Sequence, residues 1–224
     1  MMKHTRFVIV YGALRSGTTL LRLMLDGHPK LDCPGEADFL FDFLSRSEDG
    51  TWTLNAEGLA RDRIYQDSGV AVAPDKPAGD AVLDMIAQFH KSEGSVVVLM
   101  IHRGLDKVLD IFPDVQILHM LRDPRDVARS SIGMGWSGTV FHGVGHWINT
   151  ETQWQANAAK IDSNNVETLQ YEALIRGPEA ELKRVVTFFG LTYTDEMLQS
   201  YTENSTYSAP DVSLVEQWRT KQSA

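Results

Sequence analysis

The sequence has a single cysteine, Cys33, so it can form no intramolecular disulfide. A chain without disulfides is typical of a reducing compartment. The sequence also lacks any run of about 18 consecutive apolar residues, the length that a membrane-spanning helix needs. It begins MMKHTR, without the apolar stretch of a secretory signal. These absences predict a cytoplasmic protein that does not insert into membranes, unless a targeting segment has been removed.

Basic residues are scarce as well. The chain has 21 lysines and arginines against 30 aspartates and glutamates, and its net charge is -9. A general nucleic-acid binder would carry a basic stripe, so this balance argues against nucleic acid as a partner. The length of 224 residues and the 43% of hydrophobic residues are ordinary for a globular protein. We therefore expect one domain over residues 1–224, with a locally basic pocket for any anionic ligand.

The most informative stretch covers residues 8–25, VIVYGALRSGTTLLRLML. Residues 8–10 are apolar and β-branched, as in a buried parallel strand. A helix with a broad apolar face begins at Thr18. A loop containing Gly12 and Gly17 separates the two. A strand, a glycine loop and a helix together direct backbone N–H groups and a helix N-terminus toward an anion, usually a phosphate.

This loop differs from the nucleotide P-loop, GxxxxGK[ST], at one position. Gly12 and Gly17 have the right separation, but Thr18 replaces the lysine that reaches the β/γ-phosphates. The difference argues against ordinary ATP or GTP hydrolysis. A cation lies inside the loop instead, and a glycine turn of some other α/β protein is the alternative interpretation. The candidate anion-binding residues are Arg15, Ser16, Gly17, Thr18 and Thr19.

Strands and helices alternate along the rest of the chain. The patterns predict strands at residues 96–101, 116–121 and 166–170, and helices at residues 81–89, 105–112, 125–131 and 178–189. A helix is also expected from Glu36 through the apolar residues 39–44. The glycine-rich residues 132–145 form either a lid or a mobile surface loop. This alternation predicts an α/β fold with a P-loop-type, mostly parallel central sheet and helices on both faces.

A second anion-binding motif follows the strand at residues 116–121. Arg122 leaves the end of this strand, and Ser130 comes eight residues later, about two helical turns along. A guanidinium and a hydroxyl can hold a phosphate monoester together. The alternative is a solvated turn in which Arg122 pairs with Asp126.

The two motifs together resemble those of sulfotransferases that use 3′-phosphoadenosine 5′-phosphosulfate (PAPS) and release PAP. In that family the first motif binds the 5′-phosphosulfate and the second binds the 3′-phosphate. The text RSGTTLLRLMLDGHP, followed by Cys-x-Gly-Glu, resembles the tyrosylprotein branch and its bacterial relatives. Three further stretches are similar to the wider bacterial family: FPDVQILHMLRDPRDV, Tyr171-Glu172-x-Leu174 and residues 210–218.

The resemblance implies transfer of a sulfuryl group to a hydroxyl or amine acceptor, which is a small molecule, a peptide or a saccharide. Glu36 lies 21 residues after Arg15, at the place of the branch's catalytic glutamate. Pro34 differs from the local sequence of that branch, so the alignment of Glu36 with the catalytic glutamate is fixed only to within one residue. A glutamate at the start of a helix can also simply favour the helix dipole. The family's cation after the second strand matches either His102 or Arg103, and His102 is the rival candidate for the base.

A basic segment near the C-terminus usually completes the 3′-phosphate site of this family. Only Arg219 and Lys221 match it, so either the chain is truncated or that part of the site differs. The proposed chemistry needs no metal, and no clustered His/Cys spacing occurs. The alternatives are a P-loop kinase acting on a small molecule, for which only Asp123 could hold Mg²⁺, and a non-catalytic nucleotide-binding protein. The sequence names neither the acceptor nor the oligomeric state.

Overall fold

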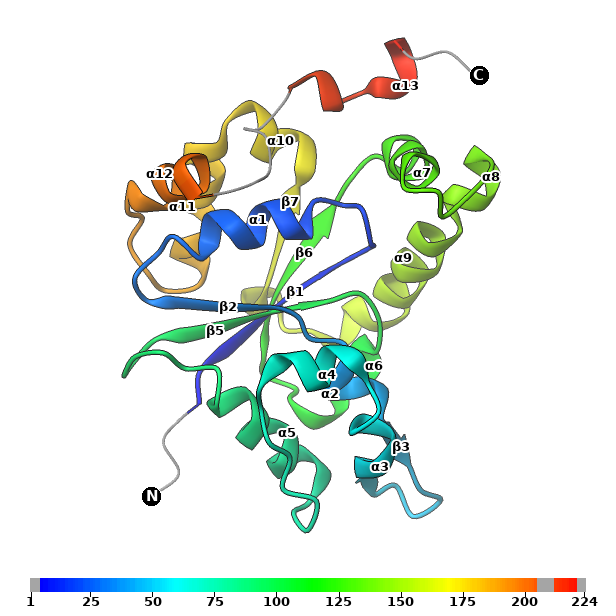
Figure 1. The fold of residues 1–224 in the computed structure, drawn as a ribbon, viewed down its shortest axis with the longest axis vertical. Helices are drawn as coiled ribbons and strands as arrows, with labels where there is room; N and C mark the ends of the chain where they lie inside the picture. Colours follow the sequence, from blue (N-terminus) through cyan, green and yellow to red (C-terminus); the bar gives the residue numbers. More distant parts are fainter. Residues whose placement is uncertain (1–4, 205–211, 221–224) are drawn as a thin grey trace.

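A five-stranded parallel sheet forms the centre of the computed structural model, which describes residues 5–204 and 212–220 (Figure 1). The spatial order of the strands is β2-β5-β1-β6-β7. The strands are β1 (Phe7–Gly12), β2 (Leu31–Glu36), β5 (Val96–Ile101), β6 (Gln116–Leu121) and β7 (Val166–Gln170). The strand β1 lies in the middle, where it pairs in parallel with both β5 and β6.

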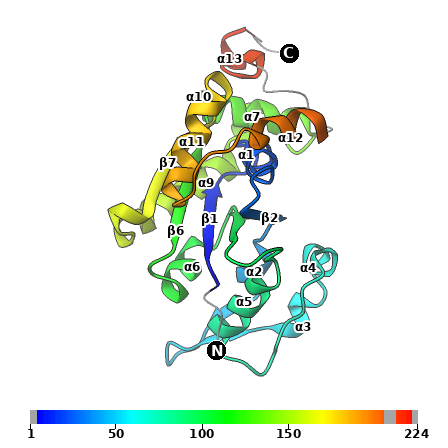
Figure 2. The same ribbon diagram turned by 90° about the vertical axis from the view of Figure 1, so that its left-hand side faces the viewer.

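Alternate residues of β1 face two separate apolar layers, because successive side chains of a strand point to opposite faces. Val8 and Val10 pack into one layer, and Ile9 and Tyr11 pack into the other. The first layer is covered by α1 (Thr18–Leu25), α10 (Tyr171–Arg176), α11 (Pro178–Phe188) and α12 (Glu196–Asn204). The second is covered by α2 (Phe39–Asp42), α5 (Ala78–Ala87), α6 (Leu105–Ile111) and α9 (Gly145–Asn157). Figure 2 shows β1 between these layers.

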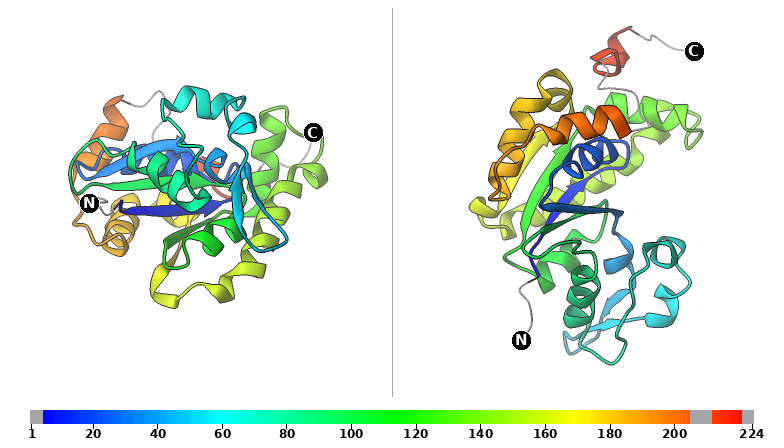
Figure 3. Two further views of the ribbon diagram at one scale, coloured as in Figure 1. Left: turned by 90° about the horizontal axis from the view of Figure 1, so that it is seen from below. Right: turned by 60° about the vertical axis from the view of Figure 1, so that its left-hand side comes forward.

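The remaining elements lie around these layers, and two of them add the buried side chains of Leu44 and Leu59 to the second layer. An antiparallel hairpin joins β3 (Leu44–Arg46) to β4 (Trp52–Leu54). The short helices are α3 (Ala56–Leu59), α4 (Arg63–Ser68), α7 (Pro124–Gly133), α8 (Val140–Gly143) and α13 (Gln217–Thr220), with 3₁₀ turns at Ala158–Lys160, Ser163–Asn165 and Val212–Leu214. In the right-hand view of Figure 3, the segment from α2 to α5 lies at the opposite end of the molecule from α13.

The fold confirms the predicted α/β class and the four predicted strands. Two local predictions are wrong. Glu36 does not begin a helix but ends the edge strand β2, and α2 is only four residues long. The segment at residues 132–145 is not one continuous loop, because it contains the end of α7 and the helix α8. Among the described residues, no helix has the length and apolar character to cross a membrane.

Candidate active site

The loop between β1 and α1 has room only for glycine at its two ends. A Cβ atom on Gly12 would lie 2.4 Å from the carbonyl oxygen of Met120, and one on Gly17 would lie 2.3 Å from Cδ2 of Tyr171. Gly17 also has a φ of 95°, in the left-handed region that favours glycine. Arg15 adopts a φ of 71° and is one of two non-glycine residues with a positive φ in the described chain. Such backbone strain is typical of functional loops.

Three carbonyl groups of this loop are bound by side chains from other elements. The Gly12 oxygen lies 2.7 Å from Nδ1 of His102, and the Leu14 oxygen lies 3.1 Å from Nε2 of His146. The Arg15 oxygen accepts a hydrogen bond of 2.9 Å from Nη1 of Arg122. Because a carbonyl can only accept, each of these histidine nitrogens carries the proton.

The opposite side of the loop supplies donors. The first N–H groups of α1 have no acceptor within the helix, and an anion at this end also gains from the helix dipole. The side chain of Ser16 is buried, and its Oγ has no hydrogen-bond partner among the described residues. Thr18 is buried and Thr19 is exposed. Buried hydroxyls are normally satisfied, so this arrangement fits a site that receives an oxyanion.

The two predicted anion-binding motifs meet at this loop. Nε of Arg15 donates to Oγ of Ser130 over 3.0 Å. The guanidinium of Arg122 is buried, lies 4.0 Å from the ring centre of Tyr171 and donates to the backbone of Arg15. The carbonyl of Arg122 accepts a hydrogen bond of 3.1 Å from Nε1 of Trp147. Arg122 is therefore not part of a solvated turn, and the hydrogen bond between Ser130 and Arg15 joins the two motifs.

The residues at the end of β5 separate into two environments. His102 is buried and directed at the loop. Arg103 turns away, because its Nε donates to Asp42 of α2 over 2.8 Å, and this hydrogen bond raises the pKa of Arg103. Of the two candidates for the cation near the transferred group, His102 is the one that contacts the loop between β1 and α1.

Asp38 is a residue that the sequence did not single out. Its buried carboxylate accepts the backbone N–H groups of His102 over 2.8 Å and of Arg103 over 3.2 Å. Burial raises the pKa of Asp38, and the His102 contacts act in the opposite direction. Asp38 thereby fixes the turn that follows β5. No spacing or motif marks it, because its partners lie more than 60 residues away.

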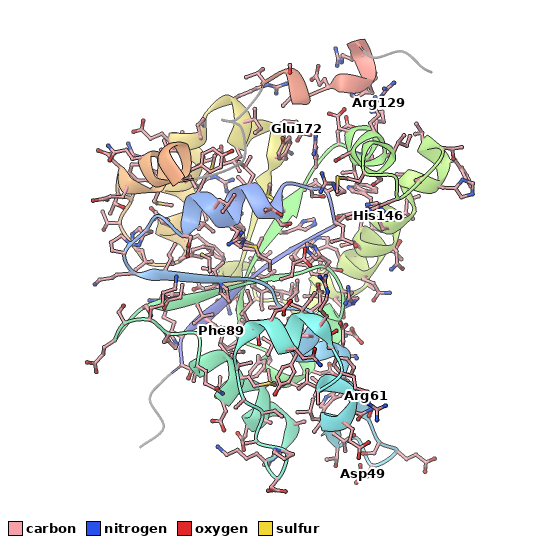
Figure 4. The ribbon with its side chains drawn as sticks, viewed as in Figure 1. Asp49, Arg61, Phe89, Arg129, His146 and Glu172 are labelled. Atoms are coloured by element: carbon pink, nitrogen blue, oxygen red, sulfur yellow. The ribbon has the colours of Figure 1, made fainter. Side chains whose placement is uncertain are left out.

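Glu36 lies at the exposed end of β2, where it pairs in register with Met100 of β5, two residues before His102. Its side chain borders an open cavity of about 390 Å³. Apolar groups of Phe39, Ile64 and Phe89 line this cavity, and Phe89 is labelled in Figure 4. Glu36 therefore lies at the end of the edge strand, beside a space large enough for a small organic group.

The C-terminal residues 212–220 lie against the start of α7, where Figure 2 shows α13 near the top of the molecule. The carboxylate of Asp126 accepts the backbone N–H groups of Glu216 over 2.7 Å and of Trp218 over 3.3 Å. The guanidinium of Arg125 lies 3.4 Å from the ring centre of Trp218. Asp126 thus anchors this segment instead of serving as a partner in a solvated turn. Of the two basic candidates in this segment, Arg219 lies 4.9 Å from the Trp218 ring, and Lys221 is outside the described residues.

Most of the chain matches a known protein family. The model of the Sulfotransferase family matches residues 8–195. Protein-tyrosine sulfotransferase A of Caenorhabditis elegans is 25% identical over 206 residues, which cover 86% of this chain and 52% of that protein. The chain therefore spans about half the length of that relative.

Solved structures of low sequence identity share the fold. The sulfotransferase domain of the Synechococcus PCC 7002 olefin synthase has a TM-score of 0.72 at 20% identity, over 98% of this chain and 90% of that domain. Mouse sulfotransferase SULT7A1, solved in complex with PAP, has a TM-score of 0.53 at 14% identity, over 90% of this chain and 65% of that one. The family match extends from β1 to the start of α12 and includes every residue of the loop. The chain belongs to the sulfotransferase family.

Proposed function

We propose that this protein transfers the sulfuryl group of PAPS to a hydroxyl or amine acceptor, and that residues 1–224 act as one domain. The observation that carries the proposal is the arrangement of the loop between β1 and α1. Three of its carbonyls are bound on one side of the loop by His102, His146 and Arg122. The N–H groups at the start of α1 and the Ser16 hydroxyl are left for an anion, while the Ser16 N–H donates to the Ala13 carbonyl. The PAP complex of the mouse structure supports the choice of nucleotide. The buried free thiol of Cys33 supports a reducing compartment such as the cytoplasm.

The two ends of PAPS are assigned to the two motifs. The backbone from Gly17 to Thr19 and the Arg15 guanidinium would hold the 5′-phosphosulfate. Arg122 and Ser130 would hold the 3′-phosphate. The Ser130 oxygen already accepts from Arg15, so its O–H group is left to donate to a phosphate oxygen. Short contacts of this charge-assisted kind are the stronger hydrogen bonds in proteins.

In the proposed reaction the acceptor oxygen attacks sulfur while the bond from sulfur to the bridging phosphate oxygen breaks. The electron pair of the broken bond stays on the bridging oxygen, so PAP leaves with that charge. Arg15 and the loop N–H groups would stabilise it. Glu36 would take the acceptor proton, a role that typically contributes about 10²- to 10⁴-fold in rate.

His102 is the rival base. Its Nδ1–H is committed to Gly12, so only Nε2 can exchange a proton with the reactants. A neutral His102 could accept a proton there, whereas a protonated His102 could donate to the bridging oxygen. The peptide, saccharide or small-molecule nature of the acceptor is left open in the proposal.

The test is a calorimetric titration with PAPS, PAP and ATP, each with and without Mg²⁺. We expect PAPS and PAP to bind without Mg²⁺ and more tightly than ATP. Tighter binding of Mg²⁺–ATP would instead favour the kinase alternative. Binding of PAP without transfer from PAPS to any of a panel of phenols, sugars, amines and alcohols would favour a non-catalytic nucleotide-binding protein.

The assignment of the 3′-phosphate has its own test in Arg122→Ala. This variant should lose the preference for PAP over AMP, because AMP lacks the phosphate that Arg122 is proposed to bind. A variant that keeps the full preference would move that phosphate to another site, such as Arg125 or Arg129.

A further inference from the structure

Two neighbouring residues of α9, His146 and Trp147, contact both halves of the proposed cofactor site. Nε2 of His146 donates to the carbonyl of Leu14, directly before Arg15, and Nε1 of Trp147 donates to the carbonyl of Arg122. We propose that this pair positions the two arginines relative to each other, so that the spacing between the 5′ and 3′ anion sites is set by α9. In this role both are positioning residues, since each acts through an arginine.

The helix α9 is itself fixed to the strands on which the arginines depend. Thr150 donates to the carbonyl of His102 over 3.3 Å and accepts, through its own carbonyl, the Tyr11 hydroxyl over 3.1 Å. The next residue, Glu151, pairs with His119 of β6 over 3.1 Å, and both side chains are buried. The helix therefore has polar contacts with residues of β1 and β6 and with the turn after β5. Figure 4 shows His146 on α9 beside the turn from β1 into α1.

Trp147 acts on the half of the site that is proposed to bind the 3′-phosphate. Its hydrogen bond holds the peptide group at the end of β6, from which the Arg122 side chain departs. That side chain lies over Tyr171 and reaches the Arg15 carbonyl. A shift of the Arg122 backbone would misplace the guanidinium relative to the nucleotide, and placement errors of this kind weaken recognition strongly.

His146 acts on the other half. The peptide group it binds precedes Arg15, which has the left-handed φ of 71°. Burial lowers the pKa of His146 and outweighs the opposing effect of the hydrogen bond to Leu14, and the nearby Arg15 guanidinium lowers the pKa further, which favours a neutral N–H donor. A neutral donor binds the loop carbonyl without adding a positive charge behind the anion site.

The inference rests on the proposed function, and its test separates the two. Dissociation constants for PAPS, PAP and AMP are measured by calorimetry on the full chain for wild type and four variants: Trp147→Phe, His146→Phe, Trp154→Phe and Arg122→Ala. Trp154 is the matched control, because it lies on the same helix and stacks on His119 at 4.0 Å between ring centres. Circular dichroism first establishes that each variant is folded.

Trp147→Phe keeps an aromatic ring but removes the N–H, so the ratio of PAP to AMP affinity should fall by about three- to tenfold, as for the loss of one buried hydrogen bond. His146→Phe should lower the ratio of PAPS to PAP affinity by a similar factor. Trp154→Phe should leave both ratios unchanged.

A merely structural role predicts a different pattern, in which PAP and AMP weaken by the same factor, and this result would overturn the inference. If Trp147→Phe does not fold, the His146→Phe ratio alone decides. If Arg122→Ala keeps the PAP preference, the 3′-phosphate assignment of the proposed function fails. If Arg122→Ala loses it while Trp147→Phe and His146→Phe keep both ratios, only the positioning role fails.

Discussion

The two sides of the proposed reaction centre are built very differently. On the cofactor side, polar side chains from distant parts of the chain are buried and bonded to one loop, as with His102 and Arg122. On the acceptor side, Glu36 is exposed beside an open cavity. Residues 132–148 contact Arg15 through Trp136 and expose six large apolar side chains: Ile132, Met134, Trp136, Val140, Phe141 and Ile148. The difference teaches that the proposed anion site is fixed by buried polar contacts, whereas the proposed acceptor side is an open and partly apolar surface.

A contact between Arg15 and Trp136 joins the two sides. The Arg15 guanidinium lies 5.6 Å from the ring centre of Trp136, so an exposed aromatic group of the acceptor side covers the arginine of the cofactor side. A cation over an aromatic face is a favourable arrangement. The following substitutions test whether the two sides are as separate as the structure indicates.

The largest effect should come from Glu36→Gln, which removes the proton acceptor and keeps the side-chain volume. Turnover should fall by about 10²-fold or more with a weakly acidic acceptor, while the PAPS dissociation constant stays close to that of wild type. Steady-state kinetics and calorimetry measure the two quantities. Glu57→Gln, at an exposed ion pair in α3, is the control. If folded Glu36→Gln keeps more than about a tenth of wild-type turnover, Glu36 is not the base, and the same loss in His102→Gln would identify the rival.

The next largest effect is expected on stability, from a difference in the packing around two glycines. Gly17→Ala places a Cβ against Tyr171 at a φ of 95°, whereas Gly135→Ala has a similar φ of 72° but open space. Urea unfolding should show a loss of about 2–4 kcal/mol for Gly17→Ala, from strain and overpacking together. Gly135→Ala should lose about 1 kcal/mol from the backbone strain alone. Equal losses at the two positions would mean that the contact with Tyr171 adds nothing.

Arg15→Ala should weaken PAPS binding more than PAP binding. The loss of a charge-assisted contact costs about 1.5–3 kcal/mol, and the sulfuryl group that Arg15 is proposed to meet is absent from PAP. Calorimetric titration of both ligands measures the difference. Arg61→Ala, whose side chain is 82% exposed and lies at the other end of the molecule, should change neither affinity. Unchanged binding of both ligands to Arg15→Ala would make Arg15 a structural residue of the loop.

The smallest effect is expected on stability from Phe141→Ser, because the Phe141 side chain is 81% exposed. Its free energy of unfolding should change by no more than about 0.5 kcal/mol, as for other exposed positions, and PAP affinity should be unchanged. Thermal melts and calorimetry provide the measurements. A large loss of stability, or of PAP affinity, would show that the apolar segment supports the cofactor side after all.

The parts of the fold that the sequence predicted well are those with a strong local pattern. The strands β5 and β6 are apolar runs buried in the middle of the sheet, and both have the predicted bounds. The edge strand β2 was missed because it contains Pro34 and Gly35, which are uncommon in strands. Proline is tolerated at the edge of a sheet, because an edge residue need not donate a hydrogen bond to a neighbouring strand. Its pairing with β5 also shifts register between Asp32 and Gly35.

The prediction of a helix from Glu36 was wrong for a related reason. Apolar residues at helical spacing can also arise where a short helix, α2, is followed by a short strand that buries Leu44. Two separate elements then bury the residues that one helix was expected to bury. Only their tertiary packing distinguishes the two cases.

The residues of the candidate site also divide into those that a sequence motif marks and those that no motif marks. Arg15, Arg122 and Ser130 lie in motifs with fixed spacing, and the fold brings them together, while their roles stay predictions. His146 and Trp147 could not be found in this way, because they bind backbone carbonyls 132 and 25 residues away. Any carbonyl can accept such a bond, so nothing in the sequence marks the partner.

The binding of the loop carbonyls from behind has a thermodynamic consequence. Turning any of the peptide groups after Gly12, Leu14 or Arg15 would break a hydrogen bond from a histidine or an arginine. The loop therefore has little conformational freedom left to lose when a nucleotide arrives. Affinity is gained when ordering costs are met before binding, so nucleotide association should be fast and should carry a small entropic penalty from the protein.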